Sequence, residues 1–147
     1  MPIIVRELTP ADRAQWNPLW KGYQTFYKVE IPEAVSDVAW ARFHDPGEPM
    51  WAFGAFEGAT MLGIVHMVRH RSTWTTGDYV YLQDLFTVEA ARGKGVGRAL
   101  IERVYDEAKK FGCSRVHWLT HETNTTAMLL YDRIADRSGF EQYRKIL

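Results

Sequence analysis

Three glycines alternate with other residues just where a helical pattern begins. Gly93, Gly95 and Gly97 lie in the stretch RGKGVGRALI. Glycine costs roughly 1 kcal/mol relative to alanine inside a helix, so this spacing indicates a task for the main chain itself. The first N–H groups of a helix lack partners and carry the positive end of its dipole, which favours bound phosphate. Arg92 and Lys94 lie beside the glycines and add positive charge, so we predict that the main chain of this loop binds an anion.

Two familiar phosphate-binding patterns do not fit this segment. The dinucleotide pattern G-x-G-x-x-G would end at Arg98 or Leu100, neither of which is glycine or alanine. A P-loop requires lysine and then serine or threonine after its last glycine, whereas Arg98 and Ala99 follow Gly97. The glycines alone also leave open a turn that only packs a helix against a sheet.

The histidines repeat at a spacing that can build metal sites on helices. His66 and His70 are four residues apart, as are His117 and His121. Both pairs fall on expected strands, where such residues lie about 13 Å apart, so we expect no metal site. His121 and Glu122 are expected at a strand end, where a polar contact with substrate or cofactor is an alternative to plain solvation.

Hydrophobic periodicity predicts the elements that position these residues. The expected strands cover residues 3–7, two runs within 50–70, then 78–88, 115–121 and 140–146. The expected helices cover about 10–26, 32–43, 96–111 and 124–137. The order β α α β β β α β α β predicts an α/β (α+β) fold with a central twisted, mixed, mostly antiparallel sheet flanked by helices.

Two of these helices have an expected buried face. In the second helix the spaced residues are Val35, Val38, Ala39 and Arg42. In the third they are Val96, Leu100, Val104, Ala108 and Phe111. Spacings of three and four residues place each set on one side of its helix.

The length and composition of the chain predict a single domain spanning residues 1–147. The chain has 46% hydrophobic and 24% charged residues, which is typical of a globular protein. Eighteen basic residues balance eighteen acidic ones, so a nucleic-acid partner is not expected. Cys113 is the single cysteine, and no apolar run reaches the roughly 18 residues of a membrane helix. With no basic leader at the N-terminus, we expect a cytoplasmic protein without a membrane partner.

The segment YLQDLFTVEAARGKGVGRALI resembles the central segment of the GNAT superfamily of N-acetyltransferases. Arg92, Gly95 and Gly97 match its hallmark of Arg or Gln, two residues, Gly, one residue, then Gly or Ala. Downstream, NTTAMLLY resembles the second cofactor segment, with matches at Asn124, Ala127 and Tyr131. The resemblance covers residues 51–147 and is strongest to polyamine acetyltransferases and fungal histone-and-other-protein acetyltransferases.

The resemblance implies the acyl-CoA N-acyltransferase fold with acetyl-CoA as cofactor. Acetyl-CoA would lie in a V-shaped opening between strands ending near Thr87 and Thr120. Its diphosphate would sit on the backbone of Arg92, Gly93, Lys94, Gly95, Val96, Gly97 and Arg98. The resemblance also implies a bulged strand before the loop and main-chain pairing of Leu85, Phe86 and Thr87 with the pantetheine. An N–H facing the thioester carbonyl there would contribute about 2.7–4 kcal/mol to catalysis.

Asn124 and Tyr131 are seven residues apart, so they share a helix face. The resemblance gives Tyr131 the role of proton donor to the departing thiolate. It gives Asn124 and Ala127 contacts with the cofactor or at the helix entry. Core packing of Tyr131 and simple N-capping by Asn124 are the alternatives.

The general base is less clear. An amine with a pKa of about 10.4 must lose a proton before it can attack a thioester. The related polyamine enzymes have a glutamate where this chain has Gln83, and an amide cannot accept that proton. Strand alternation places neighbouring Asp84 on the face of Val80, Leu82 and Phe86, which favours a structural, hydrogen-bonded aspartate over a base. A water chain or a histidine could substitute.

The expected acceptor side lies near the end of the first helix. The candidate substrate residues are Tyr23, Phe26, Tyr27 and Glu30, an aromatic wall with one carboxylate that suits a cationic amine. Glu30 is also an alternative base, and core packing is the alternative for the rings. A homodimer is expected because dimers are frequent among the similar enzymes.

These observations predict an N-acetyltransferase that moves the acetyl group of acetyl-CoA directly to a primary amine in a ternary complex. The small-molecule or peptide acceptor is expected to be a polyamine, then an amino acid, a protein lysine or N-terminus, or an aminoglycoside. Gln83 motivates the alternative of a non-catalytic acyl-CoA sensor or interaction module, and a nucleotide-binding domain is a third interpretation. The family's Gly-aromatic pair is displaced here, from Ala135 to Gly139 and Phe140, which allows a longer last helix.

Overall fold

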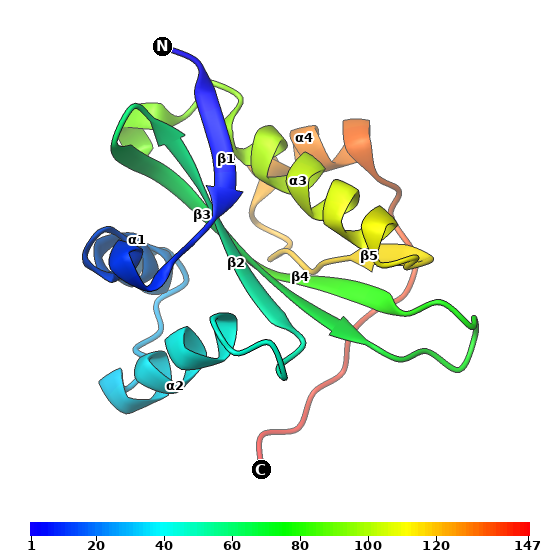
Figure 1. Ribbon diagram of the computed structural model, residues 1–147. Coiled ribbons are helices and arrows are strands. Elements are labelled where there is room, and N and C mark those ends of the chain that lie inside the picture. Colours follow the sequence, from blue (N-terminus) through cyan, green and yellow to red (C-terminus); the bar gives the residue numbers. More distant parts are fainter.

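The computed structural model describes all 147 residues and contains one five-stranded sheet, ordered β1-β2-β3-β4-β5 (Figure 1). The strands are β1 Ile3–Glu7, β2 Met50–Glu57, β3 Thr60–His70, β4 Tyr79–Thr87 and β5 Arg115–His117. The first three pairings are antiparallel, and β4 pairs with β5 in parallel. The expected mixed, mostly antiparallel sheet is therefore confirmed.

Four α-helices accompany the sheet: α1 Arg13–Phe26, α2 Glu33–Phe43, α3 Val96–Lys110 and α4 Thr125–Ile134. Short 3-10 turns precede α1 and α3, at Pro10–Asp12 and Glu89–Ala91. The first turn begins where the sequence indicates, because the Thr9 N–H donates to Oδ2 of Asp12 at 2.7 Å. None of the helices is long and apolar enough to cross a bilayer.

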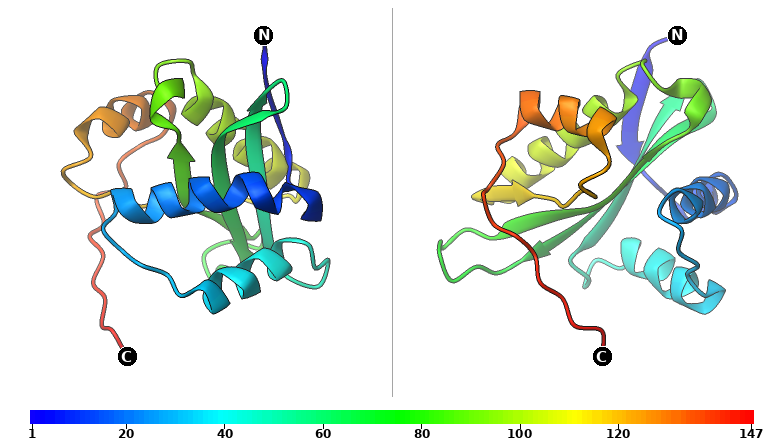
Figure 2. Two further views of the ribbon diagram at one scale, coloured as in Figure 1. Left: turned by 90° about the vertical axis from the view of Figure 1, so that its left-hand side faces the viewer. Right: turned by 180° about the vertical axis from the view of Figure 1, so that it is seen from behind.

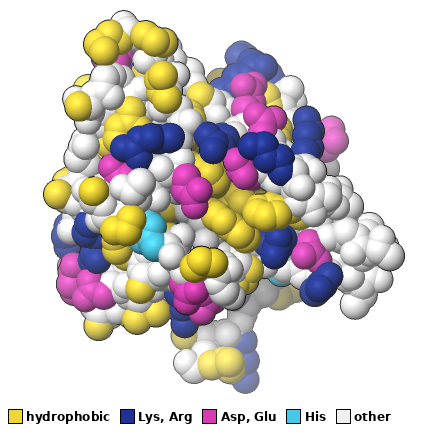
Figure 3. Space-filling view, in the orientation of Figure 1, with side chains coloured by type: hydrophobic (Ala, Val, Ile, Leu, Met, Phe, Trp, Pro, Cys, Tyr) yellow, Lys and Arg dark blue, Asp and Glu magenta, His cyan; other side chains and the backbone are white.

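The helices cover opposite faces of the sheet, α1 and α2 on one side and α3 with α4 on the other (Figure 2). The α3 face buries Phe53, Ala55, Val65, Met67, Val80, Leu82, Ala91, Val96, Leu100, Ile101, Val104 and Ala108. The α1–α2 face buries Leu8, Trp16, Leu19, Trp20, Trp40, Phe43, Ala52, Phe56, Met61 and Ile64. On the face seen in Figure 3, acidic and basic side chains are interspersed.

The buried face of α2 differs from the expected one. Ser36, Trp40 and Phe43 are buried, whereas Val35 and Val38 are exposed. The expected face of α3 is confirmed apart from its last residue, since Phe111 is 40% exposed and its ring lies 4.9 Å from that of Trp51.

The expected last strand is wrong. Helix α4 ends at Ile134, and residues 135–147 form neither helix nor strand, so the last helix is not longer than usual. A strand needs a partner, and β5 spans only three residues at the edge of the sheet. The C-terminal segment instead runs past β5 and β4 (Figures 1 and 2) and supplies side chains to the cavities described below.

Candidate active site

The parallel strands β4 and β5 separate soon after they pair. Only Tyr79, Val80 and Tyr81 of β4 have partners on β5, although β4 continues to Thr87. A cavity of about 360 Å³ lies at this separation, lined by Tyr23, Tyr27, Tyr81, Leu82, Gln83, Leu85, Trp118, Leu119, Thr120, His121, Tyr131, Gln142 and Arg144. The expected V-shaped opening is present, but β5 ends at His117 and not near Thr120.

Strand β4 bulges beside this cavity. Strand β3 pairs His66 with Asp84 and Met67 with Leu82, so Gln83 is an extra residue without a partner. This is the bulge that the family resemblance implies. It places the Gln83 side chain on the wall of the cavity.

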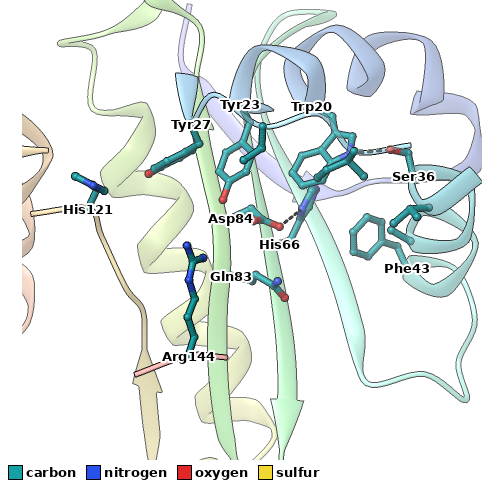
Figure 4. A pocket seen from close by; sticks show the side chains of 14 residues that line it. Trp20, Tyr23, Tyr27, Ser36, Phe43, His66, Gln83, Asp84, His121 and Arg144 are labelled. Atoms are coloured by element: carbon teal, nitrogen blue, oxygen red, sulfur yellow. Dashed lines mark hydrogen bonds and ion pairs between the residues drawn. The ribbon is translucent and has the colours of Figure 1, made fainter. Parts of the chain in front are cut away.

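The bulge also corrects the expected face of Asp84. Val80 and Leu82 pack in the α3 face, but Phe86 packs against the α1–α2 face. Because an extra residue reverses strand alternation, Asp84 shares a face with Phe86 and not with Val80 or Leu82. Its carboxylate therefore points toward α1 and α2 (Figure 4).

A buried hydrogen-bond chain holds that carboxylate. The Trp16 indole N–H donates to Nε2 of His66 at 3.0 Å, and Nδ1 of His66 lies 2.9 Å from Oδ2 of Asp84. Trp16 is 0% and His66 3% exposed. An indole only donates, so Nε2 must accept, and the neutral ring carries its proton on Nδ1. The imidazole therefore donates to Asp84, which is hydrogen-bonded as expected.

A larger cavity of about 570 Å³ lies beside Asp84 on the α1–α2 side (Figure 4). Its lining residues are Trp20, Tyr23, Tyr27, Val29, Ile31, Val35, Ser36, Ala39, Phe43, His66, Gln83, Asp84, His121 and Arg144. The Tyr23 hydroxyl points toward Asp84 (Figure 4). Burial, together with the Asp84 charge, raises the pKa of both Tyr23 and Tyr27, so both stay neutral phenols at pH 7.

The two cavities meet. Tyr23, Tyr27, Gln83, His121 and Arg144 line both of them. Asp84 lines only the larger cavity, whereas Tyr131 lines only the smaller one. The arrangement can therefore hold two reactants that approach each other near Gln83, with a carboxylate on one side and a phenol on the other.

Helix α4 delivers Tyr131 to the smaller cavity. The Tyr131 ring packs edge-on against Trp118, with centroids 5.4 Å apart. Burial, reinforced by Tyr27, raises the pKa of Tyr131 to about 12. The phenol is thus protonated throughout the neutral range and can donate a proton.

The glycine loop leaves its main chain open. None of the six backbone N–H groups from Gly93 to Arg98 donates a hydrogen bond within the chain. Gly93 and Gly95 have φ of +81° and +78°, and a Cβ on either would meet nothing within 4 Å. Lys94 makes no ion pair, and Nε of Arg98 bonds Glu102 at 2.8 Å. Unpaired donors, open space and local cations fit the diphosphate of acetyl-CoA.

The other expected cofactor residues are placed unevenly. Leu85 lines the smaller cavity, whereas Phe86, Thr87, Asn124 and Ala127 line neither. Asn124 does not cap α4 with its side chain, and its Nδ2 donates instead to Oγ1 of Thr120 at 3.2 Å. The amide therefore ties the start of α4 to the wall of the opening.

Of the four expected acceptor residues, the structure brings two into the cavities. Tyr23 and Tyr27 line both, whereas Phe26 and Glu30 line neither. Phe26 is 49% exposed, with its ring 5.9 Å from the Arg92 guanidinium. Glu30 thus stands outside the site, although its neighbours in sequence line the larger cavity.

The histidines pair differently from their sequence spacing. Nε2 of His70 lies 3.1 Å from Nε2 of His117, and Nδ1 of His121 lies 2.7 Å from the hydroxyl of Thr123. No group of three or more His, Cys, Asp or Glu side chains gathers in a way that could hold a metal ion. His121 lines both cavities, which makes a contact with a reactant possible.

Sequence reasoning missed two features of the site. The Trp16–His66 hydrogen bond joins residues 50 positions apart, and no local pattern signals it. Arg144 lines both cavities although it lies in the segment expected to form the last strand. No sequence signal identifies Arg144, because residues 140–146 have the pattern of a strand and only the structure shows that they remain unpaired.

Comparison with known proteins gives a consistent result. The model of the Acetyltransferase (GNAT) family matches residues 16–135. A D-amino-acid N-acetyltransferase, HPA3 of Saccharomyces cerevisiae, is 39% identical over 145 residues, covering 97% of this chain and 90% of the yeast protein. The thialysine N-epsilon-acetyltransferase of Bos taurus is 33% identical over 110 residues, 75% of this chain and 55% of that protein.

Solved structures share the fold at lower identity. The ribosomal-protein-alanine N-acetyltransferase of Brucella melitensis superposes with a TM-score of 0.78 over 99% of this chain and 100% of the other, at 21% identity. This similarity supports the architecture described above.

Proposed function

The chain belongs to the GNAT acetyltransferase family, and we propose that it acetylates the amine of a free amino acid. It is an N-acetyltransferase that uses acetyl-CoA as acetyl donor. The amino-acid acceptor is the proposed part. It is supported by the yeast and bovine relatives, whose names specify D-amino acids and thialysine. These names favour an amino acid as acceptor over a polyamine, which the sequence alone predicts first.

The glycine loop is the proposed cofactor cradle. The free N–H groups from Gly93 to Arg98 would bind the diphosphate, and Lys94 would add an unpaired positive charge. The open edge of β4 at Leu85 would face the pantetheine. Acetyl-CoA supplies the activated acetyl group, so the protein has to align it and manage protons.

Asp84 is the proposed proton acceptor for the amine. Its carboxylate lies on the larger cavity and is oriented by the His66 N–H, while the neighbouring Gln83 amide can only hydrogen-bond the amine. On the other side, Oη of Tyr131 holds a proton that can be donated to the sulfur leaving group. Proton uptake and proton donation are thus assigned to opposite sides of the bulge.

The observation that carries this proposal is the junction of the two cavities at Gln83, with Asp84 on one side and Tyr131 on the other. It provides room for donor and acceptor at once, as direct transfer in a ternary complex requires.

Release of free CoA thiol tests the reaction directly. The protein is incubated with acetyl-CoA and, in turn, amino acids, polyamines, a lysine peptide and an aminoglycoside. We expect the highest kcat/KM with an amino acid. Faster thiol release with a polyamine would reject the acceptor class, and no release with any amine would favour the sensor alternative for this chain.

We further propose that residues 1–147 act as one catalytic domain and that the protein is a cytoplasmic homodimer. The free thiol of Cys113 supports a reducing compartment. The exposed apolar side chains Phe140, Tyr143 and Ile146 support a contact between two copies. Sedimentation of the wild type and of Tyr143→Glu tests the dimer, which we expect to weaken in the variant.

A further inference from the structure

Arg144, which is itself exposed, extends from the C-terminal segment to the junction of the two cavities. Its guanidinium points into the space between His121 and Gln83 (Figure 4), and the residue lines both cavities. Gln142 lines the smaller cavity as well, whereas Tyr143 between them is 94% exposed. The segment therefore presents alternate side chains to the site although it belongs to no helix or strand.

The charges on the cavity walls form a simple pattern. Asp84 is the sole acidic side chain that lines either cavity, and Arg144 is the sole lysine or arginine. Arg144 has no ion pair or side-chain hydrogen bond within the chain, and no ion pair joins it to Asp84. Two opposite charges thus face one space without neutralising each other. This pattern complements a small zwitterion.

We propose that Arg144 binds the carboxylate of the amino-acid acceptor while Asp84 receives its ammonium group. The inference rests on the proposed function and deepens it. In an α-amino acid both charges are on one carbon, so fixing the carboxylate beside the junction of the cavities directs acetylation to the α-nitrogen. A guanidinium fork matches a carboxylate with two parallel hydrogen bonds.

The same pattern selects against other acceptors. A polyamine carries only positive charges, so Arg144 repels it and offers it no partner. The remaining wall of the larger cavity is largely apolar, with Ile31, Val35, Ala39 and Phe43. An acceptor with an apolar side chain, such as phenylalanine or leucine, therefore fits better than ornithine or lysine.

The test compares phenylalanine, as each enantiomer, with 2-phenylethylamine, which has the same ring and ammonium group but no carboxylate. In the wild type we expect a higher kcat/KM for one enantiomer of phenylalanine. Arg144→Gln should lower that kcat/KM about 10- to 100-fold, mostly through KM, as loss of a charged hydrogen-bonded pair implies. The kcat/KM for 2-phenylethylamine should change less than about threefold. Arg144→Lys should recover part of the loss.

Lys145→Gln is the matched control, because it removes the same charge from the next residue, which lines neither cavity. We expect it to leave both substrates unaffected. Equal losses on phenylalanine and 2-phenylethylamine, or no loss on either, would overturn the role of Arg144.

A binding measurement separates this proposal from the reaction itself. Trp20 lines the larger cavity, so a change in the total fluorescence of the six tryptophans can report phenylalanine binding without turnover. If the wild type releases no thiol yet binds phenylalanine in a manner that Arg144→Gln abolishes, the carboxylate site stands and the proposed reaction fails. If thiol is released but phenylalanine binding is the same in both proteins, the reaction stands and the carboxylate site fails.

Discussion

Nδ1 of His66 lies 2.9 Å from Oδ2 of Asp84, across the pair of strands at the point where β4 bulges. The other ring nitrogen accepts the Trp16 indole N–H, so a buried donor fixes which nitrogen carries the proton. Trp16, which lies outside both cavities, thereby orients the one carboxylate on their walls. This relationship makes Asp84 the first residue to test.

Replacement of Asp84 by asparagine should abolish most of the activity. Asparagine keeps an oxygen for the His66 N–H but cannot accept a proton, so we expect kcat/KM for the amine to fall about 10²- to 10⁴-fold. The affinity for acetyl-CoA should stay unchanged, because Asp84 does not line the smaller cavity. Steady-state kinetics and calorimetric titration with acetyl-CoA measure the two effects.

Two further variants show whether the loss of activity in Asp84→Asn comes from the missing carboxylate or from a disturbed fold. Asp78→Asn alters an aspartate outside both cavities that pairs with Arg69 and Arg71, and it should retain full activity. Adding Gln83→Glu to Asp84→Asn returns one carboxylate to the same wall and should restore part of the rate. Wild-type turnover in Asp84→Asn alone would exclude Asp84 as the base.

Removal of the Tyr131 hydroxyl should slow turnover without weakening cofactor binding. We expect Tyr131→Phe to lower kcat by at least about tenfold, since the ring packing on Trp118 is kept and only the proton donor is lost. Burial raises the pKa of Tyr131 to about 12, which favours the protonated phenol until the pH rises through that value. The wild-type kcat should therefore show no basic limb due to Tyr131 between pH 7 and 10. A limb in that range that disappears in Tyr131→Phe would contradict this assignment.

The sequence predicts the position of the glycine loop before α3 better than the direction of the side chains on β4. The loop from Gly93 to Gly97 is contiguous, and its glycines and the helix that follows are visible in the sequence. Strand alternation predicts the wrong face for Asp84, because a bulge depends on two strands and is set by the register of β4 against His66 and Met67. Alternation along β4 alone cannot reveal it.

The errors in the helices and the tail have similar causes. Ser36 is buried in α2, where its hydroxyl accepts the Trp20 indole N–H at 3.0 Å. Val38 is left exposed, and Val35, which is 54% exposed, lines the larger cavity. The tail has the composition of a strand, but strand propensity depends on a neighbour to pair with. In both α2 and the C-terminal segment, contacts with the rest of the fold therefore override the structure that the local sequence pattern predicts.

Substitution of Gly95 by glutamate should prevent acetyl-CoA binding. The residue caps α3 with φ +78° and open space above it, so a glutamate side chain would occupy and repel the diphosphate site. We expect the Kd for acetyl-CoA to rise at least about 100-fold in calorimetric titration. Gly112→Glu is the matched control, with φ +70° and open space beyond the other end of the same helix, and it should bind normally. Normal binding by Gly95→Glu would mean that the loop serves another purpose.

The ion pair between Arg6 and Asp12 should make stability depend on pH at the acidic end. The Arg6 hydrogen bonds, at 2.8 and 2.9 Å, lower the pKa of Asp12 from 3.8 to about 2. A lowered folded-state pKa stabilises the protein fully above the unfolded value, and this contribution is lost as the pH falls through about 2. Because Arg6 is 44% exposed, we expect Asp12→Asn to cost only about 1–2 kcal/mol at pH 7. Urea unfolding should show this difference at pH 7 and a much smaller one at pH 2. An equal difference at both pH values would assign the effect to the Thr9 cap and not to the charge.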